Sequence, residues 1–148
     1  MATGATLDEL PIWARALLDE VRVGHLGILD GRQRPRVLPV TFAVVGGAVW
    51  SAVDHKPKRR AGEELARVRW LRARPASTLT VDRYDDDWAR LAWVQLVGAT
   101  AVVDVAGYDG VLEALAARYP QYRDRPPAGP LLRLTAERTL CWSASDAP

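Results

Sequence analysis

Short apolar runs separated by turn signals dominate the chain after residue 22, and they predict strands. The runs cover residues 23–29, 36–45, 48–53, 76–81, 91–105, 131–134 and 140–143. Turns such as Gly46-Gly47 favour tight hairpins, because glycine adopts positive φ without strain. Gly98 divides one long run, which therefore forms one strand or a pair, and the last two runs likewise form one strand or two. The pattern predicts six or seven antiparallel strands.

Helical spacing of apolar residues occurs in three other segments. The first covers about residues 10–21, with Asp8 as the expected N-cap and Pro11 in the first turn. The second covers residues 59–73 and the third is centred on residues 111–116. A leading helix and two inserted helices among short strands are typical of a small, mainly β antiparallel barrel rather than of alternating β-α units.

The length of 148 residues predicts a single domain over 1–148, in which residues 1–7 form a disordered tail. No apolar run approaches a membrane span, and the N-terminus lacks the basic and apolar regions of a signal peptide. We therefore expect a cytoplasmic protein that does not bind membranes. One cysteine and two histidines exclude a disulfide within the chain and make a structural metal site improbable.

Positive charge is concentrated in one segment. The whole chain carries +2, whereas residues 55–74 hold eight basic and two acidic residues, a net +6 that leaves −4 for the remainder. Both lysines of the protein, Lys56 and Lys58, lie there in a loop between a strand and a helix. Lysines, a helix N-terminus and the nearby hydroxyl of Ser51 suit a phosphate. The alternative is a solvated basic loop before an arginine-rich surface helix.

Other candidate sites are weaker. The run Tyr84-Asp-Asp-Asp-Trp88 fits an exposed turn better than a catalytic carboxylate cluster, since consecutive side chains point in different directions. Neither histidine has an evident nucleophile and carboxylate beside it, so a hydrolytic triad is poorly supported. The chain contains neither a phosphate-binding glycine-rich loop nor the Rossmann glycine fingerprint. Chemistry on ATP and Rossmann-type nicotinamide binding are therefore disfavoured.

Four segments in this order carry a family resemblance: Gly24–Gly31, Arg34–Phe42, Val49–Arg59 and Ala76–Trp88. They resemble the pyridoxamine-phosphate-oxidase-like split-barrel flavoproteins. The Asp-His-Lys-Pro-Lys-Arg loop and the Tyr-Asp-Asp-Asp-Trp turn are most similar to the actinobacterial subgroup of oxidoreductases that depend on the deazaflavin coenzyme F420. This resemblance implies a split β-barrel of the FMN-binding type.

The resemblance also implies a set of cofactor-binding residues. Lys58 and Ser51 match positions that hold the cofactor phosphate, and Lys56 and Arg59 belong to the same cationic cluster. Three residues match the strand beside the tricyclic ring, and a fourth covers the site from the following turn: Pro39, Val40, Thr41 and Trp88. The glutamyl tail of the deazaflavin adds carboxylates, which gives the +6 segment a physical reason.

The implied function is hydride transfer between the deazaflavin and a small conjugated organic substrate, in a homodimer. No catalytic residue is assigned; a proton would come from Tyr84 or from solvent. The alternatives are an FMN-binding oxidase and a non-catalytic flavin or deazaflavin carrier. A nucleic-acid module is disfavoured, because the basic residues lie in one insert and no strand interleaves aromatic with basic residues.

Overall fold

The structure is a computed structural model that describes residues 1–53 and 65–146. The described residues form one antiparallel sheet of eight strands. The strands are β1 (Ala2–Gly4), β2 (Gly24–Leu29), β3 (Pro35–Val40), β4 (Ala43–Val45), β5 (Ala48–Ala52), β6 (Ala76–Arg83), β7 (Ala92–Val103) and β8 (Leu131–Ser143). The helices are α1 (Ile12–Glu20), α2 (Ala66–Ala73), α3 (Asp109–Arg118) and α4 (Gln121–Asp124), with short 3-10 turns η1 (Leu7–Glu9), η2 (Trp88–Arg90) and η3 (Ala144–Asp146). The sequence-predicted split β-barrel with inserted helices is confirmed.

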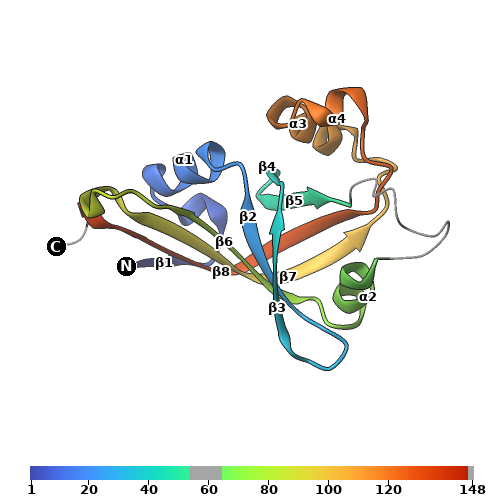
Figure 1. Ribbon diagram of the computed structural model, residues 1–148, viewed down its shortest axis with the longest axis horizontal. Coiled ribbons are helices and arrows are strands. Elements are labelled where there is room, and N and C mark those ends of the chain that lie inside the picture. The colour runs from blue at the N-terminus through green and yellow to red at the C-terminus, as the bar shows by residue number, and fades with distance from the viewer. Residues whose placement is uncertain (54–64, 147–148) are drawn as a thin grey trace.

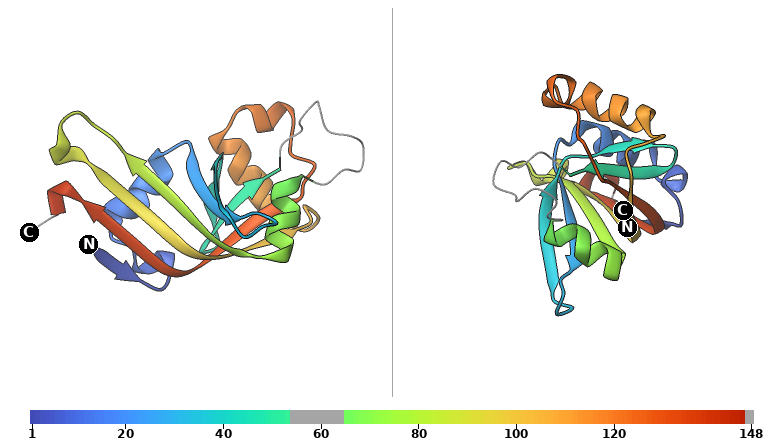
Figure 2. Two further views of the ribbon diagram at one scale, coloured as in Figure 1. Left: turned by 60° about the horizontal axis from the view of Figure 1, so that its bottom comes forward. Right: turned by 90° about the vertical axis from the view of Figure 1, so that its right-hand side faces the viewer.

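The strands follow the order β3-β2-β6-β7-β8-β5-β4, and β1 pairs with the free edge of β8. The long strands β6, β7 and β8 run side by side along the whole molecule and curve strongly (Figures 1 and 2). The run divided by Gly98 forms the single strand β7, and its ladder with β8 shifts register after Val97. A Cβ on Gly98 would lie 2.0 Å from the backbone oxygen of Thr135, so this close approach requires glycine.

The two strands at the ends of this order are neighbours in the chain. β3 pairs with β2 and β4 pairs with β5, and only Thr41 and Phe42 stand between them. The barrel is thus closed by a covalent connection, which we call the seam (Thr41–Phe42). The sequence predicts one strand over 36–45, whereas the structure divides it at the seam. Gly46 and Gly47 have φ values of 60° and 75°, which confirms the hairpin turn between β4 and β5.

Two apolar clusters fill the molecule. The larger lies inside the barrel, where α1 contributes Ala14, Leu17 and Leu18, all at most 2% exposed. The smaller lies between α3 and the β4–β5 hairpin and contains Trp50, Leu115 and Tyr119. Figure 1 shows α3 and α4 at one end of the molecule, above β4 and β5. Within the described residues, no helix has the length and apolar character needed to cross a bilayer.

The β2–β3 turn is organised by a buried acid. Asp30 is 3% exposed, and its Oδ1 accepts hydrogen bonds from the backbone N–H groups of Arg32 and Arg34. The Arg34 backbone bond in particular holds the pKa of Asp30 below its usual range. Arg36 pairs with the same carboxylate at 3.8 Å and lies over the Trp70 ring of α2.

Several local expectations need correction. Asp8 does not cap the first helix: it lies in η1, and Pro11 occupies the N-cap position of α1 without a side-chain cap. Residues 2–4, expected in a disordered tail, form β1, because β8 is longer than β5 and offers an edge to pair with. Of the predicted helix 59–73, the described part is α2. The last two runs form the single strand β8, and the loop 120–130 contains α4.

Candidate functional site

The seam interrupts the sheet ladder, so its backbone groups need other partners. The N–H of Phe42 donates to the hydroxyl oxygen of Tyr119 at 3.0 Å, and this hydroxyl lies 3.0 Å from the Phe42 carbonyl and 2.9 Å from that of Arg22. The Ser51 hydroxyl donates to the Thr41 carbonyl at 2.7 Å. The hydroxyls of Tyr119, 77 residues from Phe42, and of Ser51, ten residues from Thr41, therefore bond three backbone groups of the seam.

A groove opens beside the seam and brings together four of the predicted cofactor residues. Pro39, Val40, Thr41 and Ser51 line this groove of about 240 Å³ with Val23, Ala52 and Arg67; we call it the seam groove. The end of β3, the seam and the end of β5 converge there because β3 and β5 belong to the two hairpins that the seam joins. The structure thus gathers residues that the sequence only placed in separate segments.

Arg67 is the cation of the seam groove among the described residues. It lies in the first turn of α2, where the first backbone N–H groups of a helix have no partner within the helix. The sequence places Arg67 in the basic segment but predicts that the arginines of this helix point outward, so its contact with the groove was missed. Lys56, Lys58 and Arg59 lie outside the described residues.

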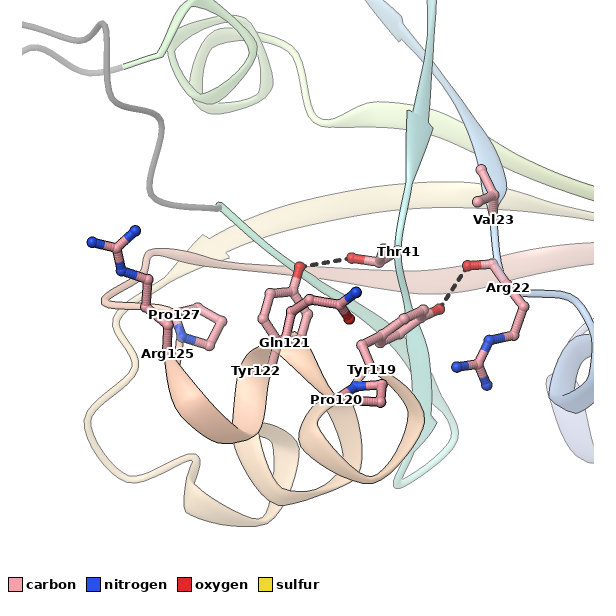
Figure 3. A pocket seen from close by; sticks show the side chains of 9 residues that line it. All are labelled: Arg22, Val23, Thr41, Tyr119, Pro120, Gln121, Tyr122, Arg125 and Pro127. Carbon is pink, nitrogen blue, oxygen red and sulfur yellow. Dashed lines mark hydrogen bonds between the residues drawn. The ribbon is translucent and has the colours of Figure 1, made fainter.

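A second, larger cavity adjoins the first. It measures about 560 Å³ and is lined by Arg22, Val23, Thr41, Tyr119, Pro120, Gln121, Tyr122, Arg125 and Pro127; we call it the tyrosine pocket. Val23 and Thr41 line both cavities. Figure 3 shows α4 and the end of α3 forming one wall and the seam strand the other, with Tyr122 reaching Thr41. Their hydroxyl oxygens are 2.8 Å apart.

The α3–α4 wall is held in place by Arg118. Its guanidinium donates to the backbone oxygens of Leu18, Asp19 and Val21, the carbonyls at the C-terminal end of α1. The same group lies 5.0 Å from the ring centre of Phe42 and 5.6 Å from that of Tyr119. The tyrosine pocket is therefore built on a fixed frame, which neither the spacing nor the local pattern of residues 118–122 reveals.

Trp88 and Tyr84, by contrast, lie away from both cavities. They are 69% and 70% exposed and flank the β6–β7 connection, which we call the tip (residues 84–90). β7 begins at Ala92, beside the tip, and ends at Val103. Val103 pairs with Leu131 of β8, which on its other side pairs with Ala52 of the seam groove. The 12 residues of β7 thus separate the two regions by roughly 35 Å along the strand. Within one chain, Trp88 does not cover the groove.

The aspartates of the tip form the predicted exposed turn. The carboxylate of Asp85 accepts a hydrogen bond from the backbone N–H of Asp87, and the carboxylate of Asp87 accepts one from the backbone N–H of Ala89. Asp85 also pairs with Arg90 at 3.2 Å. Among the described residues, no group of three or more histidine, cysteine or acidic side chains is placed to hold a metal.

Among the described residues, the cavity inside the barrel is too small for a cofactor. The cavity among Leu26, Phe42 and the surrounding core residues has a volume of about 10 Å³, no more than one water requires. Among the described residues, the seam groove and the tyrosine pocket offer room on the outer side of the barrel, beside the residues that the resemblance implies.

The fold is shared with solved structures of low sequence identity. A conserved hypothetical protein of Mycobacterium tuberculosis, Rv2991, superimposes with a TM-score of 0.74 at 18% identity, covering 96% of this chain and 91% of the other. A protein of Clostridium acetobutylicum related to general stress protein 26, of the pyridoxinephosphate oxidase family, gives 0.63 at 18%, covering 89% and 87%. The split-barrel fold of the resemblance is thus confirmed.

Two further matches are named for the groups they bind. A haem-binding protein of Mycobacterium smegmatis gives a TM-score of 0.71 at 18% identity, but the chain spans only 54% of its length, and 90% of this chain is covered. An FAD-binding protein of Mesorhizobium loti gives 0.64 at 15%, covering 95% and 97%. No family model and no curated protein matches the sequence.

Proposed function

We propose that this protein is an oxidoreductase that binds the deazaflavin coenzyme F420 along the seam groove and transfers a hydride between it and a small conjugated substrate. The observation that carries the proposal is the convergence of Pro39, Val40, Thr41 and Ser51 on one groove with a cation, Arg67. The resemblance implies the first four for cofactor binding, and they are brought together from two hairpins. Split-barrel structures named for FAD and for the pyridoxinephosphate oxidase family support a flavin-type cofactor.

The residues present fit such a cofactor. Val23, Pro39 and Val40 offer an apolar wall to a planar ring, and Arg67 offers charge to a phosphate. The single hydroxyl hydrogen of Ser51 is donated to the carbonyl of Thr41. To bind a phosphate, this hydroxyl would have to donate to the phosphate instead. The change of acceptor is favourable because a hydrogen bond to an anion is stronger than one to a neutral carbonyl.

The protein's part in the reaction would be binding and orientation. When bound, the deazaflavin supplies a hydride from C5 to an electron-poor carbon, and a proton from solvent completes the two-electron reduction of the substrate. Tyr84, the other proton donor considered, is on the tip and far from the groove of its own chain. The apolar wall and the fixed seam hold the ring in one place, and Arg67 neutralises anionic charge.

Haem fits the two cavities less well. Their described lining residues include no histidine, cysteine or methionine, the usual axial ligands of haem iron besides tyrosine. The two tyrosine hydroxyls that remain are engaged, that of Tyr119 with the backbone of Phe42 and that of Tyr122 with Thr41. A flavin or deazaflavin needs no such ligand.

We also propose a homodimer in which the tip of one copy covers the seam groove of the other. Trp88 cannot reach the groove of its own chain, and it is exposed on the tip together with Tyr84, a second aromatic side chain of the kind enriched at protein interfaces. The tip carries three aspartates, of which Asp85 is paired with Arg90, whereas the described lining of the seam groove carries Arg67 and no acidic residue. The charges of the two surfaces are complementary.

Spectral titration of the purified protein with the deazaflavin, FMN and haemin tests the proposed cofactor. We expect tight binding of the deazaflavin and protein that purifies without yellow colour from a host lacking it. Arg67→Gln and Lys58→Ala should each weaken binding by about tenfold or more, since each removes a charge-assisted bond. Arg69→Gln, an exposed arginine of the same helix, is the control. Stoichiometric FMN or haemin binding without a response to the deazaflavin would contradict the proposal.

A further inference from the structure

The tyrosine pocket is larger than a cofactor ring in the seam groove would explain. Its volume of about 560 Å³ lies within the usual range of small-molecule sites, about 300–1,000 Å³. It meets the seam groove at Val23 and Thr41, so a molecule in the pocket would lie beside a molecule in the groove. This is the arrangement that two reacting partners require.

The walls of the pocket suit a flat ligand. Tyr119 and Tyr122 pack edge to face, with ring centres 5.8 Å apart, and Val23, Pro120 and Pro127 add apolar surface. Aromatic rings and prolines offer rigid faces against which a conjugated molecule packs at little cost in side-chain entropy. Gln121, which lies between the tyrosines in the chain, adds an amide to the lining (Figure 3).

The charge of the pocket has one sign. Its described lining contains two arginines and no acidic residue. Arg22 is fixed: its guanidinium donates to the Arg118 carbonyl and lies 5.1 Å from the ring centre of Tyr119. Arg125 follows the end of α4, and none of the ion pairs among the described residues involves it. Figure 3 shows these arginines at opposite ends of the lining.

We infer that the tyrosine pocket is the substrate site and that it takes a planar, conjugated carboxylate, with Arg125 as the principal charge partner. A guanidinium matches a carboxylate with two parallel N–H···O bonds, and a pocket lined by cations without a competing acid favours an anion. Arg22, already oriented by Arg118 and Tyr119, sets the positive potential at the other end. The assignment as substrate site rests on the proposed function; the binding of a planar carboxylate does not require the cofactor.

Cinnamate and cinnamamide are suitable probes, because they share a conjugated ring system and differ in charge. Calorimetric titration of the cofactor-free protein should detect cinnamate, with cinnamamide at least roughly fivefold weaker. Arg125→Gln should weaken cinnamate by roughly fivefold, since this arginine is exposed and partly screened, and should leave cinnamamide unchanged. Raising the salt concentration should reduce the difference between the probes.

Arg123→Gln is the matched control, because Arg123 also belongs to α4 but donates to the Ala116 carbonyl and does not line the pocket. Its cinnamate affinity should equal that of the unaltered protein. Thermal melts check that each variant is folded.

The oligoglutamyl tail of a deazaflavin carries carboxylates too, so γ-glutamylglutamate forms a third arm of the titration. Binding of this dipeptide in place of cinnamate, with dependence on Arg125, would overturn the substrate assignment. Equal affinity for cinnamate and cinnamamide, or no binding of either, would overturn it as well. The outcome is separable from the cofactor question: the deazaflavin titration fails or succeeds independently of cinnamate binding to the cofactor-free protein.

Discussion

The seam and the tip lie at opposite ends of β7, and they treat aromatic residues in opposite ways. At the seam end, Tyr119 and Phe42 are 7% and 0% exposed. The Tyr119 hydroxyl bonds the N–H of Phe42, and the Ser51 hydroxyl bonds the carbonyl of Thr41. At the tip, Tyr84 and Trp88 are about 70% exposed, and the aspartates stabilise only their own turn. The seam end buries its aromatic rings among the described residues of one chain, whereas the tip leaves Tyr84 and Trp88 exposed.

The two regions differ in what they need for folding. At the seam, Thr41 and Phe42 leave the sheet ladder, so their backbone groups need hydrogen bonds from side chains elsewhere, those of Tyr119 and Ser51. The tip needs none for folding, because an Asx turn is locally satisfied. Substitutions at the seam should therefore affect folding first, and substitutions at the tip should affect association first.

Tyr119→Phe tests the seam with the largest expected effect. Loss of the hydroxyl leaves the buried N–H of Phe42 without its partner, which should lower the free energy of unfolding by about 1–3 kcal/mol. Urea unfolding measures it. Tyr84→Phe at the tip removes an exposed hydroxyl and should change this free energy by less than about 0.5 kcal/mol. Equal effects of the two substitutions would remove the contrast.

Trp88→Ser tests the tip. If the tip docks on a second copy, the dissociation constant of the dimer should rise about thirtyfold, as expected for loss of about 2 kcal/mol at an aromatic anchor. Sedimentation across a micromolar range measures this, and unfolding of the monomer should not change. Val37→Ser, at a residue 66% exposed on β3, is the control. An unaltered protein that stays monomeric throughout would contradict the dimer.

Ser51→Ala distinguishes the structural role of this hydroxyl from its role in cofactor binding. Loss of the bond to the Thr41 carbonyl should cost about 0.5–1.5 kcal/mol of stability. If the hydroxyl also turns to a phosphate, deazaflavin affinity should fall by about tenfold. A stability loss with unchanged affinity would assign Ser51 to the seam alone.

Asp30→Asn has the smallest expected effect and compares a buried acid with those of the tip. Because the folded-state pKa of Asp30 is lowered, its carboxylate stabilises the protein above the unfolded-state value near 3.8 and loses this contribution as pH falls through the lower folded-state pKa. The variant should therefore lose less stability than the unaltered protein between pH 7 and pH 3. Asp86→Asn, at an exposed tip residue, should change the free energy of unfolding at pH 7 by less than about 0.5 kcal/mol.

The sequence predicts most of the fold because short apolar runs, separated by turn residues such as Gly46-Gly47, indicate where the strands lie. It does not predict the division of 36–45, since the apolar run continues through the seam and only the pairing partner changes from β2 to β5. It also does not predict α4, a single turn in a proline-rich segment. Both failures concern features that depend on contacts rather than on local preference.

The candidate site was predictable only where a local sequence motif marks its residues. The motifs of the resemblance identify Pro39–Thr41 and Ser51, which the structure places along one groove. Arg118, Tyr119 and Tyr122 were missed because their partners lie about 80 to 100 residues away in the chain. Trp88, predicted to cover the site, lies far from the groove of its own chain, because the 12 residues of β7 separate the tip from the seam.

Because the seam has only two residues, it also links the register of the β2–β3 hairpin to that of the β4–β5 hairpin. A strand's side chains alternate faces, so inserting one residue between Val40 and Ala43 would turn either the β2–β3 or the β4–β5 hairpin inside out. Phe42 would leave the core, or Val49 and Trp50 would exchange faces. A change of length in the turn at residues 46–47 would shift the register of the β4–β5 hairpin alone, whereas a change at the seam alters the phase of one whole hairpin relative to the other. This two-residue connection therefore couples the phases of both hairpins, so an insertion or deletion there should be poorly tolerated.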